Sequence, residues 1–164
     1  MLQLPAPNMK RTFIINRQSV NDISALIVKG IRESLPTARK TKGYFQGSTD
    51  LETCRNLWEY LKDNVKYKAE PIEDQSVKTI SRIFHDKNKG NDCKHYTTFI
   101  CTYLLALGIP VKMRLVSFNI FDKSPTHIYP VAVISGKETP IDAVIDSFGI
   151  NPLGIRYKKD IKLN

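Results

Sequence analysis

The spacing of the apolar residues changes near residue 108, and this change constrains the fold more than any other feature. Before it, a run that starts at Cys93 and stops at Gly108 and Pro110 has an apolar residue every three or four positions. The recurring residues are Tyr96, Phe99, Ile100, Tyr103, Leu104 and Leu107. This spacing predicts a helix. After it, residues 111–115 alternate apolar and basic side chains, as a half-buried strand does.

Two further segments, IYPVAVI and TPIDAVI, have the composition of strands, and Ser-Gly-Lys-Glu between them suits a hairpin. Upstream, residues 19–35 have helical spacing and Pro36 closes the pattern. Residues 50–68 predict a second helix, and residues 74–86 a shorter third one. Helices followed by an antiparallel sheet predict the α+β class.

The chain has 164 residues, which is enough for one domain with a real core and too few for two. We therefore expect a single domain over residues 1–164, with its core at about 50–150. Residues 1–18 carry two prolines and little periodicity, and we expect them to form an arm. Residues 150–164 are expected to be a C-terminal extension.

Composition limits the function classes. The net charge is +9, but the lysines are dispersed and form no basic stripe interleaved with aromatics, so no specific nucleic-acid partner is expected. No apolar window is long enough to span a membrane, and no secretory signal is visible, so we expect a cytoplasmic protein. The three cysteines lack a C-x-x-C pair, which argues against a disulfide framework or a zinc site. The oligomeric state is not predicted.

Cys93 is the cysteine whose position suggests chemistry. It follows Gly-Asn-Asp directly and opens the predicted helix, on the side that is expected to face the sheet. Free N–H groups and the positive end of the helix dipole favour an anion there, and a thiolate is such an anion. The same N–H groups could hold the oxyanion of a tetrahedral intermediate. Cys54 and Cys101 lie inside predicted helices and are expected to be packing residues.

A thiol nucleophile also needs a base, usually a histidine. His95 lies two residues after Cys93, about 200° around the helix, and is therefore expected to face solvent. His85 lies in a polar stretch and is expected on the surface. His127, at the start of IYPVAVI, remains as the base.

A third group should orient that histidine. A hairpin centred near Gly136 returns the chain next to His127, and the returning segment carries two acids, Asp142 and Asp146. Asp142 lies among apolar residues, where an unpaired charge is costly, so it is expected to have a specific partner. Hairpin geometry alone does not exclude Asp146.

These residues resemble the transglutaminase-like superfamily, a branch of the papain-like cysteine enzymes. The resemblance rests on G-N-D-C before a helix, LALGIPVKMRL after it, and a histidine and an aspartate fifteen residues apart, with the hairpin glycine nine after the histidine. It spans about residues 57–146 and includes LKDNVKYK, which is similar to the family's upstream helix ending in a tyrosine. Two departures are the inserted Asn91 and the alanine, instead of proline, after Asp142.

The resemblance implies that Cys93 is the nucleophile, His127 the general base and acid, and Asp142 the residue that orients His127. It implies a cysteine peptidase or amide hydrolase that acts on a protein or peptide through a thioester, as in small single-domain bacterial and phage-type members. A transglutaminase, or an inactive binding or structural protein of a phage or prophage, is the alternative. No metal or cofactor is expected, because no dense acidic loop for calcium is visible.

Pocket residues are harder to predict from one sequence. Tyr44, Phe45 and Lys94 are aromatic and basic candidates, and each is expected to lie on the surface. Trp58 could stand beside an oxyanion, but its helical spacing with Leu57 and Leu61 favours core packing.

Overall fold

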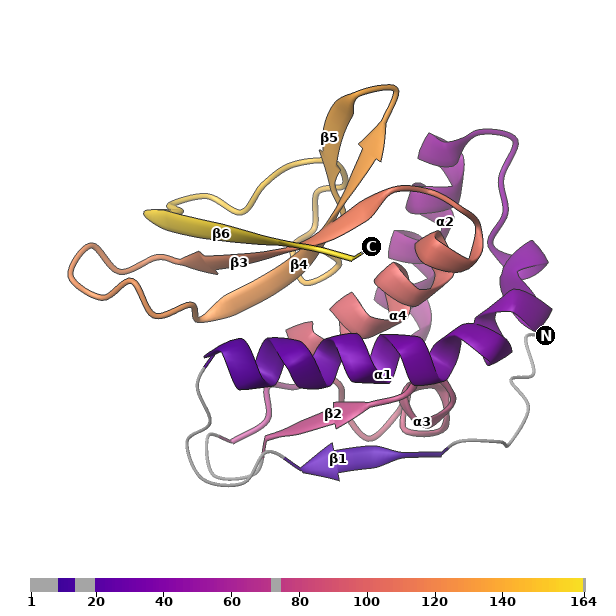
Figure 1. The fold of residues 1–164 in the computed structure, drawn as a ribbon, viewed down its shortest axis with the longest axis horizontal. Helices are drawn as coiled ribbons and strands as arrows, with labels where there is room; N and C mark the ends of the chain where they lie inside the picture. Colours follow the sequence, from indigo (N-terminus) through magenta and orange to yellow (C-terminus); the bar gives the residue numbers. More distant parts are fainter. Residues whose placement is uncertain (1–8, 14–19, 72–74, 164) are drawn as a thin grey trace.

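A computed structural model describes residues 9–13, 20–71 and 75–163. The elements in chain order are β1 (Arg11–Phe13), α1 (Val20–Thr41), the 3-10 helix η1 (Lys42–Tyr44), α2 (Asp50–Asn64), β2 (Ser76–Lys78), α3 (Ile80–His85), α4 (Cys93–Ala106), β3 (Val111–Ser117), β4 (His127–Ile134), β5 (Lys137–Pro140) and β6 (Tyr157–Lys162). Helices α1 and α4 lie between a four-stranded sheet and the two-stranded sheet of β1 and β2 (Figure 1). This mixture of helices and antiparallel sheets confirms the predicted α+β class.

The four-stranded sheet has the order β5-β4-β3-β6, and all neighbouring strands are antiparallel. The predicted hairpin centred near Gly136 is confirmed, because β4 turns into β5 through Ser135 and Gly136. Both turn residues have a positive φ, 50° and 77°, which is the backbone of a two-residue type I′ turn. At the other end of the hairpin, His127 begins β4 opposite Val116 of β3.

The helix predicted at Cys93 is confirmed as α4, but the exposed face expected for it does not exist. Every residue from Lys94 to Leu104 is buried. The sheet strands β3 and β4 cover one side of α4, while α1, α2, α3 and β2 contact the others. A position 200° from Cys93 faces solvent only if one side of the helix is exposed, and this second layer covers that side.

The predicted end of α1 at Pro36 is wrong, because the helix continues to Thr41. Proline ends helices since it lacks an N–H and crowds the preceding turn. Here the residues after the proline are held by tertiary contacts. Ala38 is fully buried, and the Thr41 hydroxyl lies 2.9 Å from the hydroxyl of Tyr103 on α4. Packing against α4 therefore offsets the local cost of the proline.

The predicted helix over residues 74–86 is also wrong in its first half. Residues 76–78 form β2, and only residues 80–85 are helical. The partner of β2 is β1, whose three residues fall in the segment that was expected to be an arm. The rest of residues 1–18, apart from 9 and 10, lies outside the described residues.

The C-terminal segment joins the four-stranded sheet. Strand β6 pairs with β3 over six residues, from Lys112 opposite Lys162 to Ser117 opposite Tyr157. Packing therefore extends beyond the predicted core of residues 50–150 at both ends. The segment TPIDAVI is a strand only at its start, because β5 ends at Pro140 and Asp142 lies in the loop that follows.

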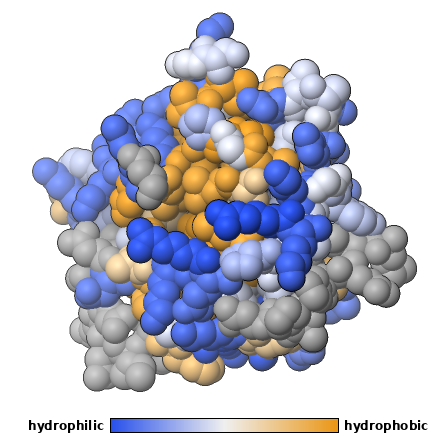
Figure 2. Space-filling view, turned by 45° about the vertical axis from the view of Figure 1, so that its right-hand side comes forward, coloured by the Kyte–Doolittle hydropathy of each residue, from blue (hydrophilic) through white to orange (hydrophobic). Residues whose placement is uncertain are grey.

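Within the described ranges, no helix is long and apolar enough to cross a membrane. Figure 2 shows the face toward the right-hand side of Figure 1, where an apolar area is only partly covered by hydrophilic side chains. Apolar surface of this kind is common on globular proteins.

Candidate active site

The segment before α4 positions Cys93 at the first residue of the helix. Asp92 is the N-cap, and its side chain accepts a hydrogen bond from the Lys94 N–H at 3.1 Å. Gly90 has a φ of 114°, which favours glycine, and it turns the chain into this cap. The N–H of Cys93, as the first helical position, has no intrahelical partner. The sulfur and a free backbone donor therefore lie at the same end of α4, as predicted.

His95 is not on the surface, and the prediction that it faces solvent is wrong. It is fully buried, and its Nδ1 accepts a hydrogen bond from the Asp92 N–H at 3.1 Å. The single N–H of the neutral ring is therefore on Nε2, which donates to the Ser76 carbonyl at 3.1 Å. Burial is the main cause that lowers the pKa of His95, to about 3. His95 is thus a neutral link between the start of α4 and β2.

His127 and Asp142 are brought together by the β4–β5 hairpin. The Nε2 of His127 lies 2.6 Å from the Asp142 Oδ2, and the two side chains are only 12% and 2% exposed. The second oxygen of Asp142 accepts from the Val144 N–H at 3.0 Å, and its backbone carbonyl accepts from the Trp58 indole N–H at 2.9 Å. Asp142 therefore has the specific partner that its apolar surroundings predicted.

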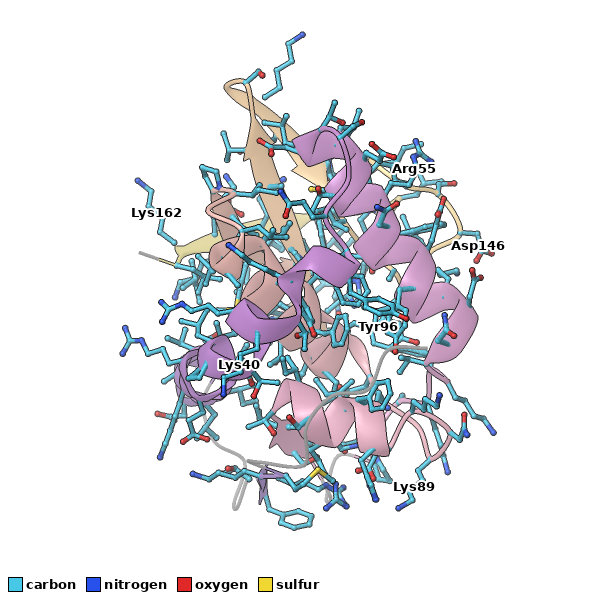
Figure 3. The ribbon with its side chains drawn as sticks, turned by 90° about the vertical axis from the view of Figure 1, so that its right-hand side faces the viewer. Lys40, Arg55, Lys89, Tyr96, Asp146 and Lys162 are labelled. Atoms are coloured by element: carbon cyan, nitrogen blue, oxygen red, sulfur yellow. The ribbon has the colours of Figure 1, made fainter. Side chains whose placement is uncertain are left out.

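Asp146, the alternative acid, lies elsewhere. Its side chain is 95% exposed and pairs with Lys62 of α2. In Figure 3 Asp146 lies at the edge of the molecule, whereas Tyr96 of α4 lies in the interior. The geometry therefore selects Asp142 as the neighbour of His127.

The thiol of Cys93 completes the group. Burial of the imidazole lowers the pKa of His127, but hydrogen bonds to the Asp142 carboxylate and to Cys93, together with their negative charges, raise it to about 10. Because Nε2 faces Asp142, Nδ1 is the ring nitrogen available to the thiol. The raised pKa favours a charged His127 imidazolium at neutral pH, next to the sulfur of Cys93.

Two aromatic rings flank the imidazole. The Tyr129 ring stacks at a centroid distance of 5.6 Å, and the Phe118 ring lies at 6.3 Å. Both hold the plane of the His127 ring, so that its two nitrogens stay directed at their partners.

Sequence comparison agrees with this geometry. A family model described as the transglutaminase-like superfamily matches residues 38–138, which is more than half of the chain. The chain belongs to the transglutaminase-like superfamily. The matched region of this superfamily includes Cys93 and His127, while Asp142 lies just beyond its end. Among curated proteins, none matches the chain.

A solved structure shows the same fold. The crystal structure of a candidate protease from Parabacteroides distasonis aligns with a TM-score of 0.59 at 14% identity, over 86% of this chain and 29% of that one. A candidate cysteine protease from Cytophaga hutchinsonii aligns with a TM-score of 0.49 at 16% identity, over 81% of this chain and 48% of that one. This chain spans less than half the length of either structure.

The residue inserted relative to the superfamily's usual Gly-Asp-Cys, Asn91, is fully buried and has a structural role. Its backbone pairs with Lys66 and Lys68, with N···O distances of 2.9 Å in both directions. Its side chain accepts from the Lys78 ammonium at 3.2 Å and donates to the Asp86 carbonyl at 3.0 Å. Asn91 therefore ties the loop before Cys93 to the segment after α2.

That segment carries Tyr67, whose place in the site the sequence analysis missed. Burial raises the pKa of the Tyr67 phenol to about 12, and the negative charges of Cys93, Asp92 and Asp142 add to the effect. The hydroxyl thus lies within electrostatic reach of the nucleophile and of the acid. The signal available in the sequence was the resemblance of LKDNVKYK to the family's helix ending in a tyrosine.

The remaining candidates divide between core and surface. Lys94 and Phe45 are buried, so their expected surface positions are wrong, whereas Tyr44 is exposed. The prediction that Trp58 packs against the core is confirmed, although its indole also contacts Asp142. Cys54 and Cys101 are fully buried, and burial raises the pKa of both thiols. His85 has a half-exposed side chain beside Asp86.

In the part of the chain that the structure describes, no cluster of three or more histidine, cysteine or acidic residues could hold a metal ion.

Proposed function

We propose that this chain is a cysteine-dependent acyl-transfer enzyme that hydrolyses a peptide or amide bond in a protein or peptide substrate. One observation carries the proposal. The imidazole of His127 contacts the Asp142 carboxylate at 2.6 Å and interacts with the thiol of Cys93, which begins α4. Covalent acyl transfer requires a nucleophile, a base that contacts the nucleophile, and an acid that orients the base.

In the first step, the Cys93 thiolate attacks the substrate carbonyl, and the C=O electron pair moves to oxygen. The backbone N–H of Cys93 donates to this oxyanion. Before the attack, the proton of the Cys93 thiol passes to His127, and the imidazolium keeps it on the nitrogen that faces the sulfur.

The intermediate collapses when the oxyanion reforms the carbonyl and the C–N bond breaks. His127 gives its proton to the leaving amine, and a thioester remains on Cys93. A water molecule then loses a proton to His127 and attacks the thioester, which releases a carboxylic acid and restores the thiolate. Asp142 stabilises the imidazolium throughout and keeps its Nε2 engaged.

Hydrolysis and transamidation share every step up to the thioester, and they differ only in whether water or an amine resolves it. We favour hydrolysis because the sequence resemblance implies a cysteine peptidase or amide hydrolase. The structure from Parabacteroides distasonis, described as a candidate protease, supports the same direction.

The test is incubation of the wild type and of Cys93→Ala with peptide libraries and a labelled primary amine, scored by mass spectrometry. We expect cleavage by the wild type, little amine incorporation, and loss of both in Cys93→Ala. Cys101→Ala is the matched control, since Cys101 is buried in the same helix away from the site. Cleavage that survives in Cys93→Ala would remove the proposal, and amine incorporation in place of cleavage would reassign it to transamidation.

A further inference from the structure

A cavity of about 130 Å³ lies beside Cys93 and His127, and four parts of the chain line it: α1, Gln75, the start of α4 and the β3–β4 region. Helix α1 contributes Ile23 and Ile27, while the β3–β4 region contributes Leu115, Pro125 and Ile128. Ser24 and Thr126 add hydroxyl groups on these two sides, and the rest of the wall there is aliphatic, next to the sulfur and the imidazole. We propose that this cavity binds an uncharged aliphatic side chain of the substrate next to the scissile carbonyl, and that α1 sets this preference. The inference rests on the proposed hydrolase function.

The ammonium and the amide that line the cavity, those of Lys94 and Gln75, are already engaged. Lys94 lines it, but its ammonium is paired with Asp92 and donates to the Gln75 Oε1 at 2.6 Å. The Gln75 amide in turn donates to two backbone carbonyls at 2.9 Å. The Lys94 side chain is only 8% exposed. A charged substrate group would lose its hydration here without gaining a free counter-charge, which is costly.

The volume favours a side chain of moderate size. An apolar cavity of about 150 Å³ holds a benzene molecule. The space beside Cys93 is slightly smaller, so branched side chains of three or four carbons fit it best. Burial of such a side chain is favourable because it removes apolar surface from water.

Helix α1 supplies the part of the cavity wall that lies outside the residues matched by the family model. Residues 23–27 lie upstream of the matched region, which begins at residue 38. Ile27 is fully buried and belongs to the core, whereas Ile23 is half-buried at the edge of the cavity. Ile23 is therefore the residue through which the preference can change without loss of the core.

The apolar surface continues outside the cavity. The loop that joins β3 to β4 ends in Pro125 and Thr126, both on the cavity wall, and it carries Phe118, Ile120 and Phe121 with exposed side chains. Phe118 lies beside the His127 ring. An apolar stretch of substrate could therefore rest along this loop, with one side chain inserted beside Cys93.

The experiment measures how fast Cys93 is alkylated by N-acetylated chloromethyl ketones of leucine, alanine, lysine and glutamate. Each rate is divided by the rate of the same reagent with a free thiol. We expect the leucine reagent to react at least about tenfold faster than the two charged reagents, as a well-fitted apolar pocket can discriminate by this much. Ile23→Glu should lower the leucine rate and raise the lysine rate.

Leu26→Glu is the matched control. It places the same charge on the same helix at a half-buried position, but Leu26 lines a different cavity, and the order of rates should stay as in the wild type. Unfolding curves of both variants check that α1 remains folded. Equal normalised rates for all four reagents, or an unchanged order of rates in Ile23→Glu, would overturn the pocket.

A second measurement separates the pocket from the reaction. Binding of N-acetyl-leucinamide and N-acetyl-lysinamide to Cys93→Ala is followed by NMR, which needs no nucleophile. A preference for the leucine amide in this variant supports the pocket. If wild-type Cys93 also reacts with neither iodoacetamide nor the ketones, the proposed hydrolase function is contradicted but the pocket is not. Equal binding of both amides overturns the pocket.

Discussion

At the scale of single residues, His127 is held between two groups that stabilise its charged form. The Asp142 carboxylate lies 2.6 Å from one ring nitrogen, and Cys93 interacts with the ring as well. Burial alone would favour the neutral imidazole, yet its pKa rises to about 10. The two partners therefore outweigh desolvation, and both of them are groups that the proposed reaction uses.

The first prediction separates the two acids. Asp142→Asn removes the charge that orients His127, and we expect kcat/KM for peptide cleavage to fall by about 100-fold or more. Asp146→Asn removes an acid that is exposed and paired with Lys62, and its activity should stay near that of the wild type. Equal losses in the two variants would mean that the wrong acid has been assigned.

The second prediction concerns pH. Since the pKa of His127 is raised to about 10, the imidazolium persists across pH 6–8, and iodoacetamide should alkylate Cys93 at a rate that changes little in this range. In His127→Ala the rate should rise with pH, as for an ordinary thiol with a pKa of about 8.5. Labelling followed by mass spectrometry measures both profiles, and buried Cys101 should stay unlabelled. Parallel profiles would mean that the charged His127 has no effect on the reactivity of Cys93.

The same raised pKa has a consequence for stability. Below the unfolded-state value of about 6.5, the His127–Asp142 pair contributes its full stabilisation, and this contribution is lost as the pH rises through about 10.

At the scale of elements, the start of α4 depends on a neutral histidine. His95 accepts from the Asp92 N–H on one side and donates to the Ser76 carbonyl of β2 on the other. An imidazolium cannot accept, so protonation would break the capping contact. The position of Cys93 therefore depends on a residue that the sequence pattern had placed in solvent.

The third prediction follows from this contact. The folded-state pKa of His95, about 3, lies below the unfolded value of about 6.5, so the unfolded chain takes up the proton first as the pH falls. The His95 contribution to the free energy of unfolding should decrease by about 2 kcal/mol between pH 7 and pH 5. Urea unfolding at both values measures it.

His95→Gln is the control for that measurement. Glutamine can keep the capping contact to the Asp92 N–H but does not titrate. Its stability should therefore fall by about 2 kcal/mol less than that of the wild type over the same interval. Identical pH dependence in the two proteins would show that His95 is not held neutral.

At the scale of the whole molecule, the ends of the described chain complete its layers. Strand β6 covers the edge of β3, and Asp160 of β6 receives two hydrogen bonds of 2.8 Å from Arg114, whose side chain is 3% exposed. Strand β1 pairs with β2 under α1 (Figure 1). These contacts join segments that are far apart in the sequence.

The fourth prediction is a chain that ends at Arg156. Without β6, the β3 edge is unpaired and Arg114 loses a partner in a buried position, which costs about 3 kcal/mol or more. We expect this chain to elute as large aggregates in size-exclusion chromatography. Asp160→Asn keeps the strand and should elute as the wild type, with a lower urea midpoint. If the shortened chain elutes like the wild type and has the same urea midpoint, this role of β6 is contradicted.

Local pattern was a reliable guide where one segment or one hairpin decides the structure. The helix at Cys93 and the turn at Gly136 follow from spacing over a few residues, and the fifteen-residue separation of His127 and Asp142 is set by the hairpin between them. The pattern failed where a distant segment supplies the partner. Residues 76–78 are a strand because β1 lies beside them, and α1 passes Pro36 because α4 holds its last turn.

The amino-acid order alone thus determined the α+β class, the helix that begins at Cys93, and the candidates His127 and Asp142, because helical and strand periodicity are local properties. Only the tertiary structure decided between Asp142 and Asp146. It also placed His95 in the interior and brought Tyr67 and the first turns of α1 to the site. Those outcomes depend on which surfaces pack together, and hydrogen-bond partners and desolvation exist only once distant segments are in contact.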